Sequence, residues 1–224
     1  MNINTRTINE NIIKNYNYGK NRIKIIVDSF NLFQFFGWLL CLNLFVLHTF
    51  LKFIARKDDE STSNILSMCV MVLKITQTMQ IFEVVLAALK LGGSSVGTSF
   101  VQILSRLIVI YIFLYKETPL LNLGLFLIPW CIADSTRAIF YVQKDSKLIG
   151  ILRYNLFIIL YPLGVAGEVL LMEKSLTENK LLSYYNLIRL YQLATLVGLV
   201  FLYTYLLQQR KKFYKKVKDD TKIN

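Results

Sequence analysis

The sequence predicts an all-α protein, a polytopic membrane helix bundle with six transmembrane helices. Of the 224 residues, 54% are hydrophobic, and the mean hydropathy of +0.45 is too high for an ordinary soluble domain. The apolar residues form six successive runs, each about as long as a helix that crosses a bilayer. Lys and Arg number 26 against 14 Asp and Glu, and they gather at the two ends of the chain. This placement fits membrane lipids as partners and argues against nucleic acid.

The expected order is a basic cytosolic N-terminal segment, a membrane domain and a basic cytosolic tail, at residues 1–28, 29–208 and 209–224. The first segment has no apolar run long enough for the core of a signal peptide, so we expect a flexible lead. The first span, 29–51, is followed by charged residues without a small-residue cleavage pattern, and we expect it to remain as an anchor. The other spans are expected at about 64–89, 96–115, 120–143, 148–172 and 184–208.

Polar side chains interrupt the second, third and fourth spans at helical spacing. In the second span, a stripe of Lys74, Gln77 and Gln80 is expected to face the bundle. In the fourth span, one helix face carries polar residues at intervals of four, three and four: Trp130, Asp134, Arg137 and Tyr141. Buried charges often pair to hold helices together. Mutual neutralisation is therefore a structural alternative to a role in chemistry for the intramembrane set Glu83, Arg106, Asp134 and Arg137.

The fifth span contains a carboxylic acid and two phenols on one helix face. It reads LRYNLFIILYPLGVAGEVLLM from Leu152 to Met172. An ionisable side chain costs roughly 2.5 to 3.5 kcal/mol to insert into hydrocarbon, so Glu168 is a functional candidate. Tyr154, Tyr161 and Glu168 are seven residues apart. Seven residues make nearly two full turns with about 10 Å of rise, so the three side chains point the same way.

Helix-breaking and small residues lie between the second phenol and the acid. Pro162 is expected to kink the helix beside Tyr161. Gly164 and Gly167 remove side-chain bulk, so we expect the helix to open a pocket there. A simpler interpretation treats Tyr161 as a packing residue and Glu168 as an interfacial carboxylate.

The cysteines and the histidine do not indicate a metal site. Cys41, Cys69 and Cys131 lie in apolar runs without zinc-like spacing, and we expect them to be small buried side chains. His48 is the single histidine, near the end of the first span, and we expect it at the membrane interface. One histidine cannot build a His-based zinc site.

Four segments together resemble the 3-hydroxyacyl-CoA dehydratases, the protein-tyrosine-phosphatase-like A family of fatty-acid elongation. The fifth span is similar to the family pattern LRYxLFxxLYPxGxxGE, and the start of the third span, SSVGTSFVQILSR, is similar to SsvxxTxxQvxSR. The fourth span resembles WxxxExxRYxxY, and FNLFQFFGW in the first span resembles YNxxQxxGW. The sequence departs from the family at four positions: Phe30 and Ala138 replace tyrosines, Asp134 replaces glutamate, and Leu86 stands where histidine is common.

The resemblance implies the site and the reaction. In the family, the tyrosine before the proline and the glutamate after the second glycine are the catalytic pair, which implies Tyr161 and Glu168 here. The implied activity is that of a carbon–oxygen lyase converting long-chain 3-hydroxyacyl-CoA to trans-2-enoyl-CoA, without a metal or redox cofactor. The implied setting is the endoplasmic reticulum, with the elongase and the two reductases of the elongation cycle as partners. We expect binding or supporting roles for Gln102, Arg106, Asp134, Arg137, Arg153 and Tyr154.

Dehydration removes a weakly acidic proton from C2 and releases hydroxide from C3, so it needs a base and an acid. We expect Glu168 to be the base and Tyr161 the acid, because a carboxylate is the better acceptor and a phenol can donate at neutral pH. The sequence leaves the reverse assignment open. It also leaves open a non-catalytic membrane scaffold or lipid-binding relative, which the departures from the family favour, and a small transporter whose polar face lines a path.

The basic residues predict the orientation in the membrane. When the Lys and Arg outside the spans are assigned to alternate sides, the side with both termini carries 15 and the opposite side 6. Cytosolic loops carry the excess of Lys and Arg in membrane proteins. Both termini are therefore expected in the cytosol.

Overall fold

The computed structural model describes residues 3–56, 59–91, 95–114, 118–177 and 182–223. These residues form helices and no β-strand, so the predicted all-α fold class is confirmed. The elements in chain order are α1 (Ile3–Phe53), α2 (Glu60–Met79), α3 (Ile81–Ala88), α4 (Val96–Ile108), the π-helix η1 (Val109–Phe113), α5 (Leu120–Val142), α6 (Lys147–Thr177), the 3₁₀ turn η2 (Leu182–Tyr184) and α7 (Tyr185–Ile223).

Six helical segments are long and apolar enough to cross a membrane, as predicted. Two of them are irregular. The second span consists of α2 and α3, which meet at Gln80. The third consists of α4 and the π-helical turn η1, a helix irregularity that is frequent at functional sites. The expected end of the third span, residue 115, lies outside the described residues.

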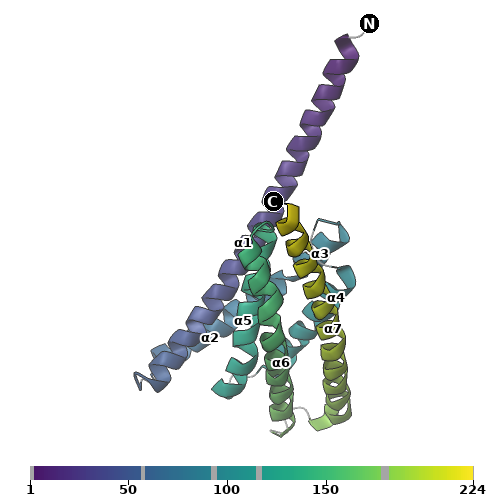
Figure 1. Cartoon of the computed structure of the whole chain (residues 1–224). Helices are drawn as coiled ribbons and strands as arrows, with labels where there is room; N and C mark the ends of the chain where they lie inside the picture. The colour runs from purple at the N-terminus through teal and green to yellow at the C-terminus, as the bar shows by residue number, and fades with distance from the viewer. Residues whose placement is uncertain (1–2, 57–58, 92–94, 115–117, 178–181, 224) are drawn as a thin grey trace.

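The expectation of a flexible N-terminal lead is wrong. Helix α1 begins at Ile3 and continues into the first span, and it extends away from the rest of the bundle (Figure 1). The physical reason is that nothing in residues 3–28 stops a helix, because the first of the three prolines is Pro119. At the other end, α7 likewise continues beyond the predicted span into the basic tail.

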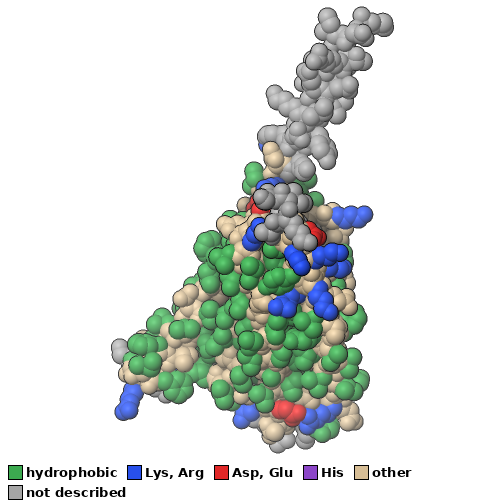
Figure 2. All heavy atoms as spheres, viewed as in Figure 1, with side chains coloured by type: hydrophobic (Ala, Val, Ile, Leu, Met, Phe, Trp, Pro, Cys, Tyr) green, Lys and Arg blue, Asp and Glu red, His purple; other side chains and the backbone are tan. Residues whose placement is uncertain are grey.

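The bundle is built around α5. Helix α5 packs against both α1 and α6, while α2 packs on α1 and α7 packs on α6. Large side chains from these helices form the core, among them Trp38, Phe126, Leu127, Trp130 and Leu171. Apolar side chains also cover much of the outer surface, as expected of helices that face lipid (Figure 2).

The cysteines are buried as predicted, and the histidine is buried between two helices. Cys41 and Cys69 face each other from α1 and α2, with 3.8 Å between their sulfur atoms. His48 is 3% exposed, and its Nδ1 atom lies 2.9 Å from the carbonyl oxygen of Thr62. The hydrogen bond to this carbonyl compensates for moving the imidazole from water to the α1–α2 contact.

The contact between α5 and α6 depends on Gly167. A methyl group at this position would lie 2.5 Å from the backbone nitrogen of Phe126 and 2.7 Å from the carbonyl carbon of Leu125. These are backbone atoms of α5, which cannot rotate away as a side-chain tip can. Only glycine therefore allows the two helices to approach to this distance, as small residues do in membrane helix pairs.

Replacing Gly167 with alanine should separate α5 from α6 and lower the stability of the protein. We expect a loss of about 1 to 3 kcal/mol, the usual cost of overpacking, measured as thermal unfolding of the purified protein in detergent. Gly198 on α7 is a matched control, since an added methyl group there meets nothing within 4 Å. Gly198→Ala should keep or raise the unfolding temperature, and equal effects of the two substitutions would refute the close-approach explanation.

Candidate active site

One face of α6 lines two adjoining cavities inside the bundle. The inner cavity has a volume of about 190 Å³, and the outer cavity has a volume of about 260 Å³. Tyr161 and Arg106 line both cavities, so the cavities meet there. Of these two cavities, Glu168 lines only the inner one and Tyr154 only the outer one. The three α6 residues that the seven-residue spacing placed on one face thus all face this cavity system.

The structure brings together every residue that the sequence analysis proposed for the site. Each lines one cavity or both, although they come from three different helices. Their roles remain predictions, because position alone does not assign chemistry. The eight residues are Gln102 and Arg106 on α4, Asp134 and Arg137 on α5, and Arg153, Tyr154, Tyr161 and Glu168 on α6.

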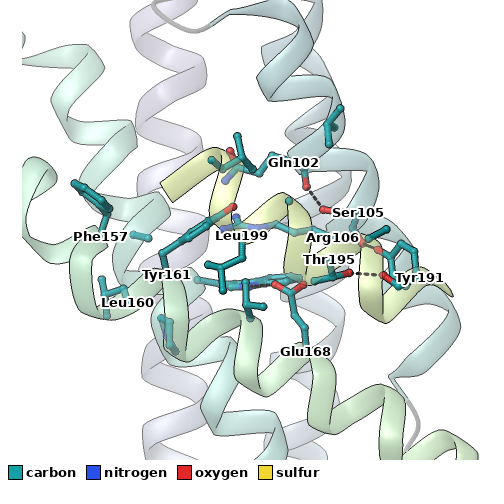
Figure 3. Close-up of a pocket in the computed structure, with 18 residues that line it drawn as sticks. Gln102, Ser105, Arg106, Phe157, Leu160, Tyr161, Glu168, Tyr191, Thr195 and Leu199 are labelled. Carbon is teal, nitrogen blue, oxygen red and sulfur yellow. Dashed lines mark hydrogen bonds between the residues drawn. The ribbon is translucent and has the colours of Figure 1, made fainter. Parts of the chain in front are cut away.

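The carboxyl group of Glu168 is buried and oriented by a tryptophan. Glu168 is 6% exposed, and its Oε1 atom accepts a hydrogen bond of 3.0 Å from the indole Nε1–H of Trp130 on α5. Figure 3 shows Glu168 and Tyr161 extending from α6 into the same cavity. Since Trp130 occupies Oε1, the second carboxyl oxygen is available to a ligand in the cavity.

A network of buried charges supports this tryptophan. The guanidinium of Arg106 lies 4.5 Å from the centre of the Trp130 ring and forms an ion pair with Asp134. Asp134 is also 2.9 Å from Arg137, and Arg137 is 2.9 Å from Glu83 on α3. Two cations and two anions therefore neutralise one another. The network joins α3, α4 and α5, as the structural alternative in the sequence analysis proposed.

The lining of the cavities identifies the arginine next to Glu168. Three arginines are among the predicted site residues. Only Arg106 lines the inner cavity, whereas Arg137 and Arg153 line the outer one alone. Arg106 is held by Asp134 and by the Trp130 ring. Its position is therefore fixed before a ligand enters.

Among the lining residues that reasoning from the sequence did not assign to the site, three lie in the inner cavity near Glu168 or tie α7 to it. Trp130 was placed on a polar face but not assigned to the site, and Tyr191 and Thr195 of α7 were not considered. Tyr191 donates a hydrogen bond of 3.0 Å to the carbonyl oxygen of Ser105, which ties α7 to α4 across the inner cavity (Figure 3). The available signal was the four-residue spacing of Tyr191 and Thr195 inside an otherwise apolar span.

The pocket predicted from the two glycines arises differently. Neither Gly164 nor Gly167 lines a described cavity. A methyl group added at Gly164 would lie 3.4 Å from the Trp130 side chain, and one added at Gly167 would clash with the α5 backbone. The glycines thus bring α5 close to α6, and the cavity forms where Tyr161 and Glu168 face α4 and α7.

Two departures from the family motif have visible consequences. Asp134, in the place of glutamate, reaches both Arg106 and Arg137 despite its shorter side chain. Ala138, in the place of tyrosine, is 5% exposed and belongs to the buried apolar residues. The shorter acid is therefore long enough to pair with two arginines.

Fold and site together define a membrane-embedded helix bundle with an acid and a phenol facing one enclosed cavity, a class suited to proton transfer on a lipid-soluble substrate. Residues 77–216 match the family described as protein tyrosine phosphatase-like protein, PTPLA. The chain belongs to this family, so the assignment made from the motifs is confirmed. No solved structure gives a significant match.

Curated relatives carry the names of enzymes. The chain is 34% identical over 163 residues to the very-long-chain (3R)-3-hydroxyacyl-CoA dehydratase hpo-8 of Caenorhabditis elegans, covering 62% of this chain and 75% of the relative. It is 35% identical over 156 residues to a probable dehydratase of the same name from Schizosaccharomyces pombe, covering 62% and 72%. Identity to dehydratase 1 of Mus musculus is 36% over 115 residues, covering 48% of this chain and 41% of the relative.

Removing the central acid of the charge network should unfold the protein. Asp134 is 2% exposed and bridges two arginines, so Asp134→Ala leaves buried positive charge without its partner. We expect a loss of roughly 3 to 5 kcal/mol, seen as a low yield of monodisperse protein and a lower unfolding temperature. Glu173→Ala is the matched control because its ion pair with Arg189 is solvent-exposed, and it should change little. Normal stability of the Asp134 variant together with lost activity would instead make Asp134 a functional group.

Proposed function

We propose that this chain is a lyase that converts long-chain 3-hydroxyacyl-CoA to trans-2-enoyl-CoA in fatty-acid elongation. The observation that carries the proposal is the placement of Tyr161 and Glu168, from one helix face, in one cavity of a protein of this family. The relatives named above as dehydratases support the reaction. The buried cavity supports a substrate whose acyl chain enters from the membrane.

The geometry fits an elimination with one base and one acid. The free oxygen of the Glu168 carboxylate takes the C2 proton, the electron pair of the C–H bond forms the C2–C3 double bond, and the C3–O bond breaks. Tyr161 protonates the departing hydroxyl, so water leaves. The proton on Glu168 then returns to the tyrosinate, and the enzyme is restored. Trp130 holds the carboxylate in place while it takes the C2 proton, which lowers the free-energy cost of positioning the base.

The contacts of each group support this assignment of base and acid. Glu168 accepts a hydrogen bond from an indole N–H at one carboxyl oxygen, which orients the group and leaves the second oxygen to accept a proton from the substrate. Tyr161 lies beside Arg106 where the two cavities meet. A nearby cation stabilises the tyrosinate that forms when the hydroxyl leaves.

The proposed substrate and product fit a setting between two reductions. A 3-hydroxyacyl thioester arises by reduction of a 3-oxoacyl thioester, and an enoyl thioester is consumed by a further reduction. We propose that the protein works in the endoplasmic reticulum membrane beside the elongase and the two reductases of the cycle, as the family resemblance implies. Co-purification of these enzymes with the tagged chain tests the association. The scaffold alternative loses one of its arguments, because Asp134 pairs with two arginines despite its shorter side chain.

Removing either proton-transfer group should abolish most of the activity while leaving the fold intact. Tyr161→Phe and Glu168→Gln keep the shape of each side chain, and each should lower turnover by a factor on the order of 10² to 10⁴. The double variant should lose less than the product of the two factors, because the groups act in one step. The assay follows enoyl-CoA formation by purified protein in detergent. Tyr203→Phe is the control, since Tyr203 packs on Phe157 outside both cavities. Dehydration at the wild-type rate by the Glu168 variant would exclude the mechanism.

The orientation in the membrane can be tested separately. Six spans put both ends of the chain on one side, and the basic residues favour the cytosol. Tags at the two termini should both be digested when protease is added to sealed microsomes. Protection of one tag only would show an odd number of spans, and protection of both would reverse the orientation.

A further inference from the structure

The catalytic face of α6 continues to the start of the helix. Lys147 precedes Tyr154 by seven residues, as Tyr154 precedes Tyr161, so all three share a face with Glu168. A third cavity, of about 390 Å³, lies over this first turn. It shares Tyr154 and Gln209 with the outer cavity. Shared lining residues thus join three cavities in a row along α6.

The third cavity, here called the entrance, is basic and aromatic. Three exposed lysines line it, Lys144, Lys147 and Lys212, against one carboxylate, Asp145. Figure 2 shows Lys and Arg side chains gathered over the end of the bundle where α6 begins and α7 approaches its C-terminus. Aromatic rings also line the entrance, and those of Tyr154 and Phe213 stack with 4.7 Å between their centres. Lysines and aromatic faces are the groups that bind phosphates and a nucleobase.

A further cation lies deeper, between the entrance and the reaction centre. Arg153 lines the outer cavity and forms no ion pair with the described residues. Its Nη1 atom is buried and donates no hydrogen bond. Its guanidinium stacks 4.4 Å from the centre of the Phe140 ring, and its Nη2 atom donates a hydrogen bond of 3.3 Å to the Tyr141 hydroxyl. A buried donor is normally satisfied, so this one indicates a ligand.

The contrast with the other buried arginines strengthens this interpretation. Arg106 and Arg137 are neutralised by Asp134 and Glu83. Arg153, by contrast, forms no ion pair with the described residues. Among the residues that line the entrance, the three lysines face a single carboxylate, that of Asp145. The positive charge along this stretch of α6 is therefore available to an anion.

We propose that the three joined cavities form the coenzyme A channel, with the adenosine 3′-phosphate at the entrance lysines, the diphosphate between them and Arg153, and the pantetheine arm in the outer cavity. This inference rests on the proposed function. An extended pantetheine arm spans roughly 15 Å from sulfur to phosphorus, by ordinary bond lengths. The helix rise puts Tyr161 about 12 Å from Arg153 and about 21 Å from Lys147. With the thioester at Tyr161, the diphosphate falls between the two cations.

The test exchanges the entrance lysines and compares two substrates. Lys144, Lys147 and Lys212 are replaced together by glutamine. The control replaces Lys211, Lys215 and Lys218 by glutamine. These substitutions remove the same charge from exposed positions of α7 that do not line the entrance. The substrates are one 3-hydroxyacyl chain carried on coenzyme A or on pantetheine, which lacks all three phosphates. Binding of adenosine 3′,5′-bisphosphate to the detergent-solubilised protein is measured in parallel.

We expect the entrance variant to raise KM for the CoA thioester on the order of tenfold, from three exposed charge pairs, with little change in kcat. Its KM for the pantetheine thioester should match that of the wild type, and its affinity for the bisphosphate should fall.

Three results would overturn the proposed channel: an unchanged KM for the CoA thioester, an equal effect on both thioesters, or an equal effect of the control variant. If the wild type dehydrates neither thioester, the proposed function fails, and the bisphosphate measurement alone decides: binding that depends on the entrance lysines supports the site, and no binding refutes it.

Discussion

The structure depends on placing a carboxylic acid inside a membrane without leaving uncompensated charge. Glu168 has a neutral partner, the indole N–H of Trp130. The tryptophan is in turn covered by the guanidinium of Arg106, whose charge is balanced by Asp134, and the network continues through Arg137 to Glu83. Because an isolated charge in hydrocarbon is costly, these residues must remain together. The network that makes the bundle stable therefore also holds the carboxyl group of Glu168 in place.

Helix α5 transmits this constraint to the site. It carries the tryptophan and the central aspartate, and it meets α6 where Gly167 allows the backbones to come close. That contact sets the two helices in the register at which Trp130 faces Glu168. A shift of α6 along its axis by one turn, about 5 Å, would separate the pair. The packing of a small residue and the position of the Glu168 carboxyl group are thus linked through a single helix pair.

Much of the fold and part of the site could be predicted from the sequence, for physical reasons that differ between residues. Apolar runs of membrane length identify the spans, and the seven-residue spacing identifies the α6 face, because both depend only on local helix geometry. The partner of Glu168 could not be predicted, since Trp130 reaches it only through the packing of α5 on α6. The burial of His48 likewise depends on a carbonyl of α2, and the packing role of Gly167 depends on the α5 backbone. The helix at the start of α1 was missed because charge and polarity were taken as signs of flexibility.

The same helix geometry explains why we propose that the dehydration takes place deep in the bundle. The charged nucleotide of an acyl-CoA stays in water, while its acyl chain is most stable in hydrocarbon, so the thioester must cross between the two. The pantetheine arm fixes how far the thioester can reach from the charged end, roughly 15 Å. On α6, the distance from the cations to the proposed catalytic pair, Tyr161 and Glu168, is fixed by the rise of 1.5 Å per residue. In the channel that we propose, lengthening the helix between Arg153 and Tyr161 would move these two groups beyond the reach of the arm. Shortening it would bring them toward the entrance, where the carboxylate would no longer be shielded from water.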